Sequence, residues 1–179
     1  LIYGLGFFVL GLAVALEIGR ISESRFSRAM PYLAAFGLLH GTHEWIEMLG
    51  LLGLAAYDFT PPPWWGFARL VLLAASFAAL VAFGVHMLYT SSTRPATGRW
   101  ATLGMTTLYV AGALALGVRR EGEAWVTAAD AWTRYSLAVP GALLAAAALR
   151  SQWKILKEAG LSSFARNFLW AAVCFGLYG

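Results

Sequence analysis

Four ionisable side chains lie close together within one apolar stretch of the sequence: His40, His43, Glu44 and Glu47, here called the His/Glu cluster. Imidazole and carboxylate groups transfer protons, bind transition-metal ions and form ion pairs, so this set is the first candidate for chemistry in the chain. At 100° per residue, the four side chains fall at roughly 0°, 300°, 40° and 340° around a helix. They therefore share one helix face.

The remainder of the chain is too apolar for an ordinary soluble protein. Of its 179 residues, 60% are hydrophobic and 12% are charged, and the mean hydropathy is +0.67, which is typical of membrane proteins. A charged side chain at mid-membrane costs on the order of 3 kcal/mol, so we expect the His/Glu cluster to face the interior of a helical bundle. The net charge of +4 forms no basic face with interleaved aromatic residues, which argues against nucleic acid as a partner.

Six apolar segments predict an all-α polytopic transmembrane bundle that forms a single domain over residues 1–179. Pro31 is expected in the first turn of the second helix, where a missing N–H does least harm, and Pro140 is expected to kink the fifth helix. Residues 119–132 are expected to be a polar connection at the membrane interface. Gly160 is expected to stop the extended fifth helix. The six segments are 1–18, 30–57, 66–89, 100–118, 135–149 and 163–179.

Lysine and arginine residues are unequally shared between alternate connections. Nine fall near the first, third and fifth connections, whereas the opposite side has only Arg119, Arg120 and Arg134, with Arg69 slightly inside the membrane. The positive-inside rule therefore places the first group in the cytoplasm and the amino terminus outside. Six spans leave residue 179 outside, so we expect a longer native chain with a seventh span. The nine residues are Arg20, Arg25, Arg28, Arg94, Arg99, Arg150, Lys154, Lys157 and Arg166.

The first interpretation of the His/Glu cluster is a metal or haem site. At 1.5 Å per residue, His40 and His86 lie at similar expected depths, about 25 and 30 Å from the outer boundary. Imidazole nitrogens suit zinc, copper and iron, so these two histidines are candidate ligands of one metal ion or haem iron. His43 with Glu44 or Glu47 would supply a mixed nitrogen and oxygen site.

Two further interpretations remain open. In one, the cluster is a hydrogen-bonded seam that fixes helix packing, with Glu47 paired to Arg69 on the next helix. In the other, it forms a polar pocket for a small ligand, a proton or a quinone-like headgroup, walled by Phe36, Trp45 and Met48. Such a pocket would give the cluster a sensing role.

Motifs for enzymatic chemistry are missing from the sequence. The run from His40 to Glu44 places its glutamate after the second histidine, which is not the arrangement of helical zinc proteases. The single cysteine, Cys174, excludes an internal disulfide, and no lysine lies inside an apolar segment to form a Schiff base with retinal. We therefore expect the domain itself to be catalytically inert.

Two stretches resemble the amino-terminal multi-span sensory modules of certain bacterial sensor histidine kinases. The run Leu33–Trp45 (LAAFGLLHGTHEW) is similar to their second helix, and Leu1–Ala13 (LIYGLGFFVLGLA) looks like their opening span. The resemblance implies an inner-membrane input domain of about seven helices, followed in the full-length chain by cytoplasmic PAS and kinase parts. The motif positions that it covers are His40, His43, Glu44 and Trp45.

The sequence therefore predicts the sensory input domain of a two-component signalling protein, which senses a small ligand, a proton or a redox state. We expect a homodimer in the bacterial inner membrane, without a required cofactor. One alternative is a haem- or quinone-binding subunit of an electron-transfer complex, with His40 and His86 as ligands, and another is a small transporter. The expected sensing residues are His40, His43, Glu44, Trp45, Glu47 and Arg69.

Overall fold

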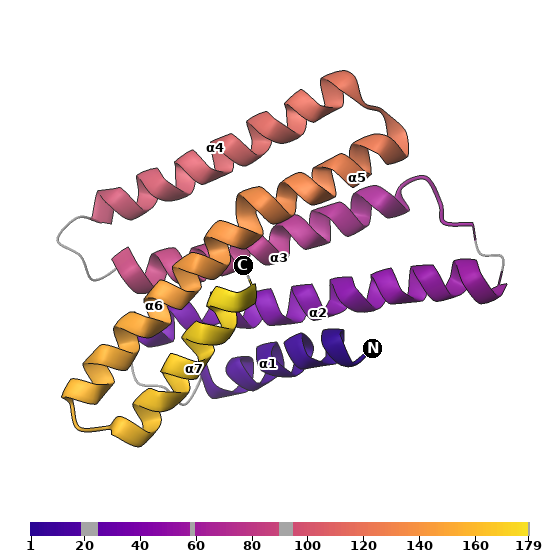
Figure 1. The fold of residues 1–179 in the computed structure, drawn as a ribbon. Helices are drawn as coiled ribbons and strands as arrows, with labels where there is room; N and C mark the ends of the chain where they lie inside the picture. The colour runs from indigo at the N-terminus through magenta and orange to yellow at the C-terminus, as the bar shows by residue number, and fades with distance from the viewer. Residues whose placement is uncertain (19–24, 58–59, 90–94, 179) are drawn as a thin grey trace.

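The chain folds into an all-α bundle (Figure 1). The computed structural model describes residues 1–18, 25–57, 60–89 and 95–178, and no strand occurs within these ranges. Helices α5, η1 and α6 follow one another without a break, so the described residues form six continuous helices, as the six apolar segments predict. The elements are α1 (Ile2–Ile18), α2 (Arg25–Tyr57), α3 (Trp65–Tyr89), α4 (Pro95–Arg119), α5 (Gly122–Thr133), the π-helix η1 (Arg134–Ala138), α6 (Val139–Glu158) and α7 (Ser162–Tyr178).

Three expected helix boundaries are wrong: the starts of the second and fourth helices, and the limits of the connection after the fourth. Helix α2 begins at Arg25, so Pro31 lies inside the helix and not in its first turn. Helix α4 begins at Pro95, because proline suits a first helical position where an N–H has no partner. The expected polar connection, residues 119–132, is mostly the helix α5, whose Trp132 indole donates to the Tyr109 carbonyl of α4 at 3.0 Å.

The expected kink at Pro140 takes the form of a π-turn. The Val139 N–H donates to the carbonyl of Arg134, five residues earlier. A proline lacks an N–H and its ring collides with the carbonyl four residues before it, so a wider turn just ahead of Pro140 relieves both problems. Helix α6 then continues to Glu158, and Gly160, with φ +82°, turns the chain into α7 as predicted.

Helices α1 and α2 approach closely because glycines line their contact. A Cβ added at Gly11 would lie 2.5 Å from the Leu38 nitrogen, and one added at Gly41 would lie 2.7 Å from the Gly4 carbonyl oxygen. Gly37 and Gly41 form a small-xxx-small pair, the spacing that brings helix backbones together. This contact holds α1 against the part of α2 that carries the His/Glu cluster.

The core lies where α3 packs against α2 and against α6. Large rings from α2 and α3 fill it, and alanines of α6 close it, which lets α6 approach α3 closely. Figure 1 shows α2 and α3 side by side, with α1 along α2 and the α6–α7 pair crossing them. The buried residues at this junction are Phe36, Leu73, Phe77, Leu80, Phe83, Ala142 and Ala145.

Two helices are long and apolar enough to cross a membrane by length and composition, and α1 is apolar but shorter. They are Trp65–Tyr89 and Trp100–Arg119, and none of the most apolar stretch of the second is buried. Of the basic residues used for the topology, Arg20 and Arg94, together with the side chains of Arg25 and Arg99, lie outside what the structure describes.

Candidate functional site

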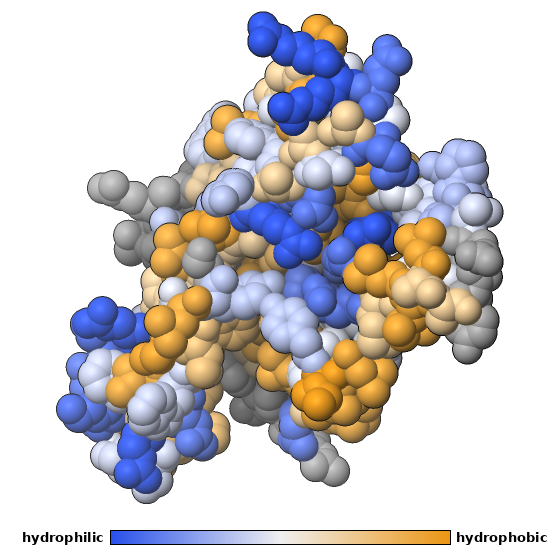
Figure 2. All heavy atoms as spheres, turned by 45° about the vertical axis from the view of Figure 1, so that its right-hand side comes forward, coloured by the Kyte–Doolittle hydropathy of each residue, from blue (hydrophilic) through white to orange (hydrophobic). Residues whose placement is uncertain are grey.

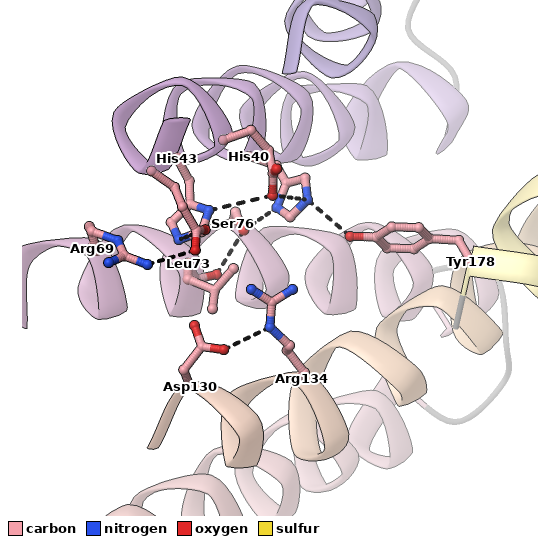
Figure 3. Close-up of polar contacts among 10 residues, drawn as sticks. His40, His43, Arg69, Leu73, Ser76, Asp130, Arg134 and Tyr178 are labelled. Carbon is pink, nitrogen blue, oxygen red and sulfur yellow. Dashed lines mark hydrogen bonds and ion pairs between the residues drawn. The ribbon is translucent and has the colours of Figure 1, made fainter. Parts of the chain in front are cut away.

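The His/Glu cluster faces the interior of the bundle, as its helical stripe predicts. His40 and His43 are buried, with 1% and 0% of their surface exposed. Glu44 and Glu47 are 22% and 31% exposed. Figure 3 shows His40 and His43 of α2 pointing toward α3.

His40 is held by hydrogen bonds on both ring nitrogens. The Ser76 hydroxyl donates to the Leu73 carbonyl at 2.7 Å, so its oxygen accepts from Nδ1 of His40 at 3.3 Å. The Tyr178 hydroxyl donates to Nε2 at 3.0 Å. This pattern assigns the proton of a neutral imidazole to Nδ1. The ring also stacks on Phe36, with 5.3 Å between centroids, so its orientation is fixed.

Glu47 pairs with Arg69 of α3, as predicted. Its Oε1 accepts from Arg69 Nη2 at 2.8 Å, and the two side chains are about equally exposed, 31% and 30%. The pair joins α2 to α3 near the open edge of the cluster. It uses one carboxylate oxygen of Glu47 and leaves the other turned toward His43.

His43 lies between the two carboxylates without a hydrogen bond. Its Nδ1 is 3.7 Å from Glu44 Oε1 and its Nε2 is 3.8 Å from Glu47 Oε2, and neither nitrogen has a partner among the described residues. One ligand atom from each of the three side chains lies within 4.8 Å of the others, close enough for one metal ion. These three residues are therefore the set that can hold a metal.

An ion pair from α5 completes the charges around the cluster. Arg134 Nε donates to Asp130 Oδ1 at 2.8 Å, and Figure 3 shows the Arg134 guanidinium pointing toward the cluster. The expectation that Arg134 lies at an outer connection is wrong, since it stands in the middle of a continuous helix. The i, i+4 spacing of an acid and an arginine is the sequence signal that was missed.

Tyr178 and Tyr3 are also part of the site and were not expected there. Tyr178 reaches His40 from α7, and Tyr3 of α1 lines the same hollow as Glu44. No local sequence signal links residues 3, 40 and 178, because only the packing of α1 and α7 on α2 brings them together.

Two predicted site residues lie apart from the cluster. Trp45 points at α1, where its indole donates to the Leu1 carbonyl at 3.3 Å and its ring packs on Phe8. His86 lies ten residues beyond Ser76 on α3, about 15 Å along the axis, and contacts Tyr32 at 3.5 Å. The structure therefore does not bring His86 and His40 to one metal ion or haem iron.

Two open hollows adjoin the cluster. One of about 440 Å³ is lined by Glu47, Arg69, Glu123 and Asp130 among others. The second, of about 570 Å³, is lined on the α1 side by Tyr3, Glu44, Glu47 and the predicted wall residue Met48. Figure 2 shows hydrophilic side chains gathered in a hollowed area between hydrophobic ones. Water and small ions therefore have access to the carboxylates.

Comparisons with protein-family models, with curated proteins and with solved structures find no match to this chain. Its function is therefore inferred from the chemistry of the His/Glu cluster and of the surface around it.

Proposed function

We propose that the chain is the membrane-embedded input domain of a bacterial signalling protein of the histidine kinase type, and that the state of the His/Glu cluster sets how its helices pack. The observation that carries this proposal is the polar connection through His40, which joins Tyr178 of α7 to Ser76 of α3. A movement of the His40 ring on α2 would therefore disturb hydrogen bonds to two other helices, α3 and α7. The domain itself catalyses nothing.

The proposed mechanism needs two helix arrangements that differ in their affinity for whatever occupies the cluster. A ligand shifts such an equilibrium only through that difference. His43, Glu44 and Glu47 are the binding groups, and the hydrogen-bonded His40 is the link to α7. Small shifts of packed helices are a common way in which such modules switch, and the output domain lies downstream in the full-length chain.

The apolar outer surface supports a position in a lipid bilayer, which we propose is the bacterial inner membrane. Large apolar side chains are exposed along α4 and α7, including Leu114 at 68% and Leu177 at 84%. Soluble monomers rarely expose contiguous apolar patches larger than a few hundred Å², whereas lipid tails cover such surfaces at no cost. In this proposal the chain spans the bilayer several times, with its amino terminus outside, and works as a homodimer.

The test uses membranes that contain the full-length gene product. We expect ATP-dependent autophosphorylation, and we expect Glu44→Gln and His40→Gln to change its level at least about fivefold, since allosteric couplings are typically 1–3 kcal/mol. The direction depends on which arrangement activates the output. Phosphorylated protein is measured on gels after normalising for the amount of protein in the membrane.

Thr106→Val is the matched control. Thr106 is exposed on α4 and its hydroxyl donates only to the Thr102 carbonyl of its own helix, at 2.9 Å. This variant should leave phosphorylation unchanged. A full-length product without a signalling output, or equal phosphorylation in folded Glu44→Gln, His40→Gln and wild-type protein, would refute the proposed function.

A further inference from the structure

Among the described residues, two have buried side-chain nitrogens without a hydrogen bond: His43, at both ring nitrogens, and Arg69, at Nε alone. His43 is fully buried, yet neither ring nitrogen forms a hydrogen bond to any described residue. An unsatisfied buried polar group costs about 1–3 kcal/mol, and nearly all such groups in proteins have a partner. His40, one turn away on the same face, has both ring nitrogens bonded. The contrast indicates that the His43 nitrogens are available to bind a ligand.

We infer that His43, Glu44 and Glu47 bind one divalent transition-metal ion, with Zn²⁺ as the best fit. The inference deepens the proposed function, because it names the ligand that the His/Glu cluster senses. Water would complete the coordination, since Glu44 and Glu47 line an open hollow.

The three side chains lie close together without being joined to one another by hydrogen bonds. The nitrogen–oxygen separations of 3.7 and 3.8 Å exceed hydrogen-bond range. Two ligands held 2.0–2.1 Å from a tetrahedral zinc ion are about 3.3 Å apart. The two separations start from different ring nitrogens of His43, and one ion binds only one of them. With one ligand atom from each residue, the three atoms lie within 4.8 Å of one another. Side-chain rotations that move these atoms by about 1.5 Å would therefore bring them to the spacing of zinc ligands.

The surrounding residues orient these ligands. Arg69 binds Oε1 of Glu47 at 2.8 Å and thereby leaves Oε2 for the metal, which is the usual task of groups behind a metal site. Three carboxylates (Glu44, Glu47 and Asp130) face two guanidinium groups (Arg69 and Arg134), so one negative charge is unbalanced when the histidines are neutral. A divalent cation suits this excess.

The donor set favours a particular class of metal. An imidazole nitrogen with two carboxylate oxygens suits Zn²⁺ and neighbouring divalent transition metals. Ca²⁺ and Mg²⁺ prefer oxygen ligands alone and more of them. We therefore expect Zn²⁺ to bind and Mg²⁺ in large excess not to compete.

The experiment measures metal binding to the purified chain in detergent after removal of metal with a chelator. Titration calorimetry with ZnCl₂ should give one Zn²⁺ per chain, and Co²⁺ should bind with the visible absorption of a tetrahedral nitrogen and oxygen site. His43→Phe should abolish binding, while Glu44→Gln and Glu47→Gln should each weaken it at least about tenfold. Circular dichroism shows which variants retain the helical fold.

His86→Phe is the matched control, because this histidine lies on α3 and bonds to the Ala82 carbonyl and Tyr32. It should bind Zn²⁺ as the wild type does. The metal site is overturned if wild-type protein does not bind Zn²⁺, or if folded His43→Phe binds it equally well. If Zn²⁺ binds as described but leaves phosphorylation of the full-length protein unchanged, the sensing role fails and the site stands. If Glu44→Gln changes phosphorylation and no Zn²⁺ binds, the metal site fails and the proposed function stands.

Discussion

His40 and His43 belong to one helix face but are held in different ways. His40 donates from Nδ1 to Ser76 and accepts from Tyr178 at Nε2, whereas His43 has carboxylates at both nitrogens, beyond hydrogen-bond distance. Packing and hydrogen bonding thus fix the first ring, and its role is to connect helices. The second ring has no hydrogen bond and is the one that the proposed metal site uses.

This difference predicts the tautomer of His40. A neutral imidazole free in water prefers its proton on Nε2, but here the Ser76 oxygen can only accept, because its own hydrogen is used on the Leu73 carbonyl. Nitrogen-15 spectra of the detergent-solubilised protein at pH 8 should therefore show His40 protonated at Nδ1. Ser76→Ala should shift the ring toward the Nε2 form, and a wild-type spectrum already in that form would contradict the assigned hydrogen bonds.

The Glu47–Arg69 ion pair contributes little to the stability of the bundle. Both side chains are about a third exposed, and solvent weakens such pairs to about 1 kcal/mol or less. It therefore orients the carboxylate more than it stabilises the bundle. The sequence suggested this pair within one interpretation of the cluster, although the two residues were expected at different depths and the long arginine side chain was expected to close only part of the gap. The structure confirms the pair.

At the scale of elements, the contact of α1 with α2 depends on glycine at chosen positions. A Cβ at Gly11 would lie 2.5 Å from the Leu38 nitrogen of α2, whereas a Cβ at Gly6 meets nothing within 4 Å. Both glycines stand in the same helix, so they provide a matched pair. Helix propensity favours alanine at either position by about 1 kcal/mol, and only the packing differs.

We expect Gly11→Ala to destabilise the protein by about 1–3 kcal/mol, the usual cost of overpacking, and Gly6→Ala to be neutral or stabilising. Reversible unfolding in mixed micelles, followed by circular dichroism, measures both. Because Gly11 packs beside the α2 segment of the His/Glu cluster, the same variant should also weaken metal binding. Equal stabilities of the two variants would mean that α1 does not pack on α2 as described.

Helix α5 was not predicted from the sequence, and its contacts with α4 explain why. Residues 122–133 contain enough charged and polar side chains to look like a connection, but Trp125 and Trp132 donate to carbonyls of α4 at 3.3 and 3.0 Å and hold the segment as a helix. Those bonds depend on a neighbour more than ten residues away in the chain. Periodicity within the segment itself could not reveal them.

For the whole molecule, the sequence predicted the number of helices and the inward-facing stripe, because both depend on local spacing. It did not predict Tyr3, Asp130, Arg134 or Tyr178 as members of the site. The i, i+4 spacing of Asp130 and Arg134 predicts their ion pair but not its place beside α2, and Tyr3 and Tyr178 come from two further helices. It also wrongly joined His40 with His86. The expected depths of His40 and His86 were similar, but Ser76, the residue of α3 that contacts His40, lies ten residues from His86, about 15 Å along the helix axis.

The distribution of apolar surface makes a prediction about the whole molecule in the bilayer. The segment Trp100–Arg119 is about 30 Å long, close to the thickness of the hydrocarbon core, and Leu114 in it is exposed. The α4–α5 connection lies near one end of the bundle in Figure 1, and the α6–α7 turn lies at the other. Glu123 is in the first turn of α5, and Lys157 is in the last turn of α6. The charged ends should therefore meet water on opposite sides.

Single cysteines at these three positions, in a Cys174→Ser background, test the arrangement in intact spheroplasts treated with a membrane-impermeant maleimide. The greater number of basic residues near the α6–α7 turn predicts that it is cytoplasmic. Glu123→Cys should therefore react in intact spheroplasts, Lys157→Cys only after lysis, and Leu114→Cys in neither case, because lipid covers it. Reaction of Leu114→Cys in intact spheroplasts would show water where the proposal requires hydrocarbon, and reaction of Lys157→Cys before lysis would reverse the topology.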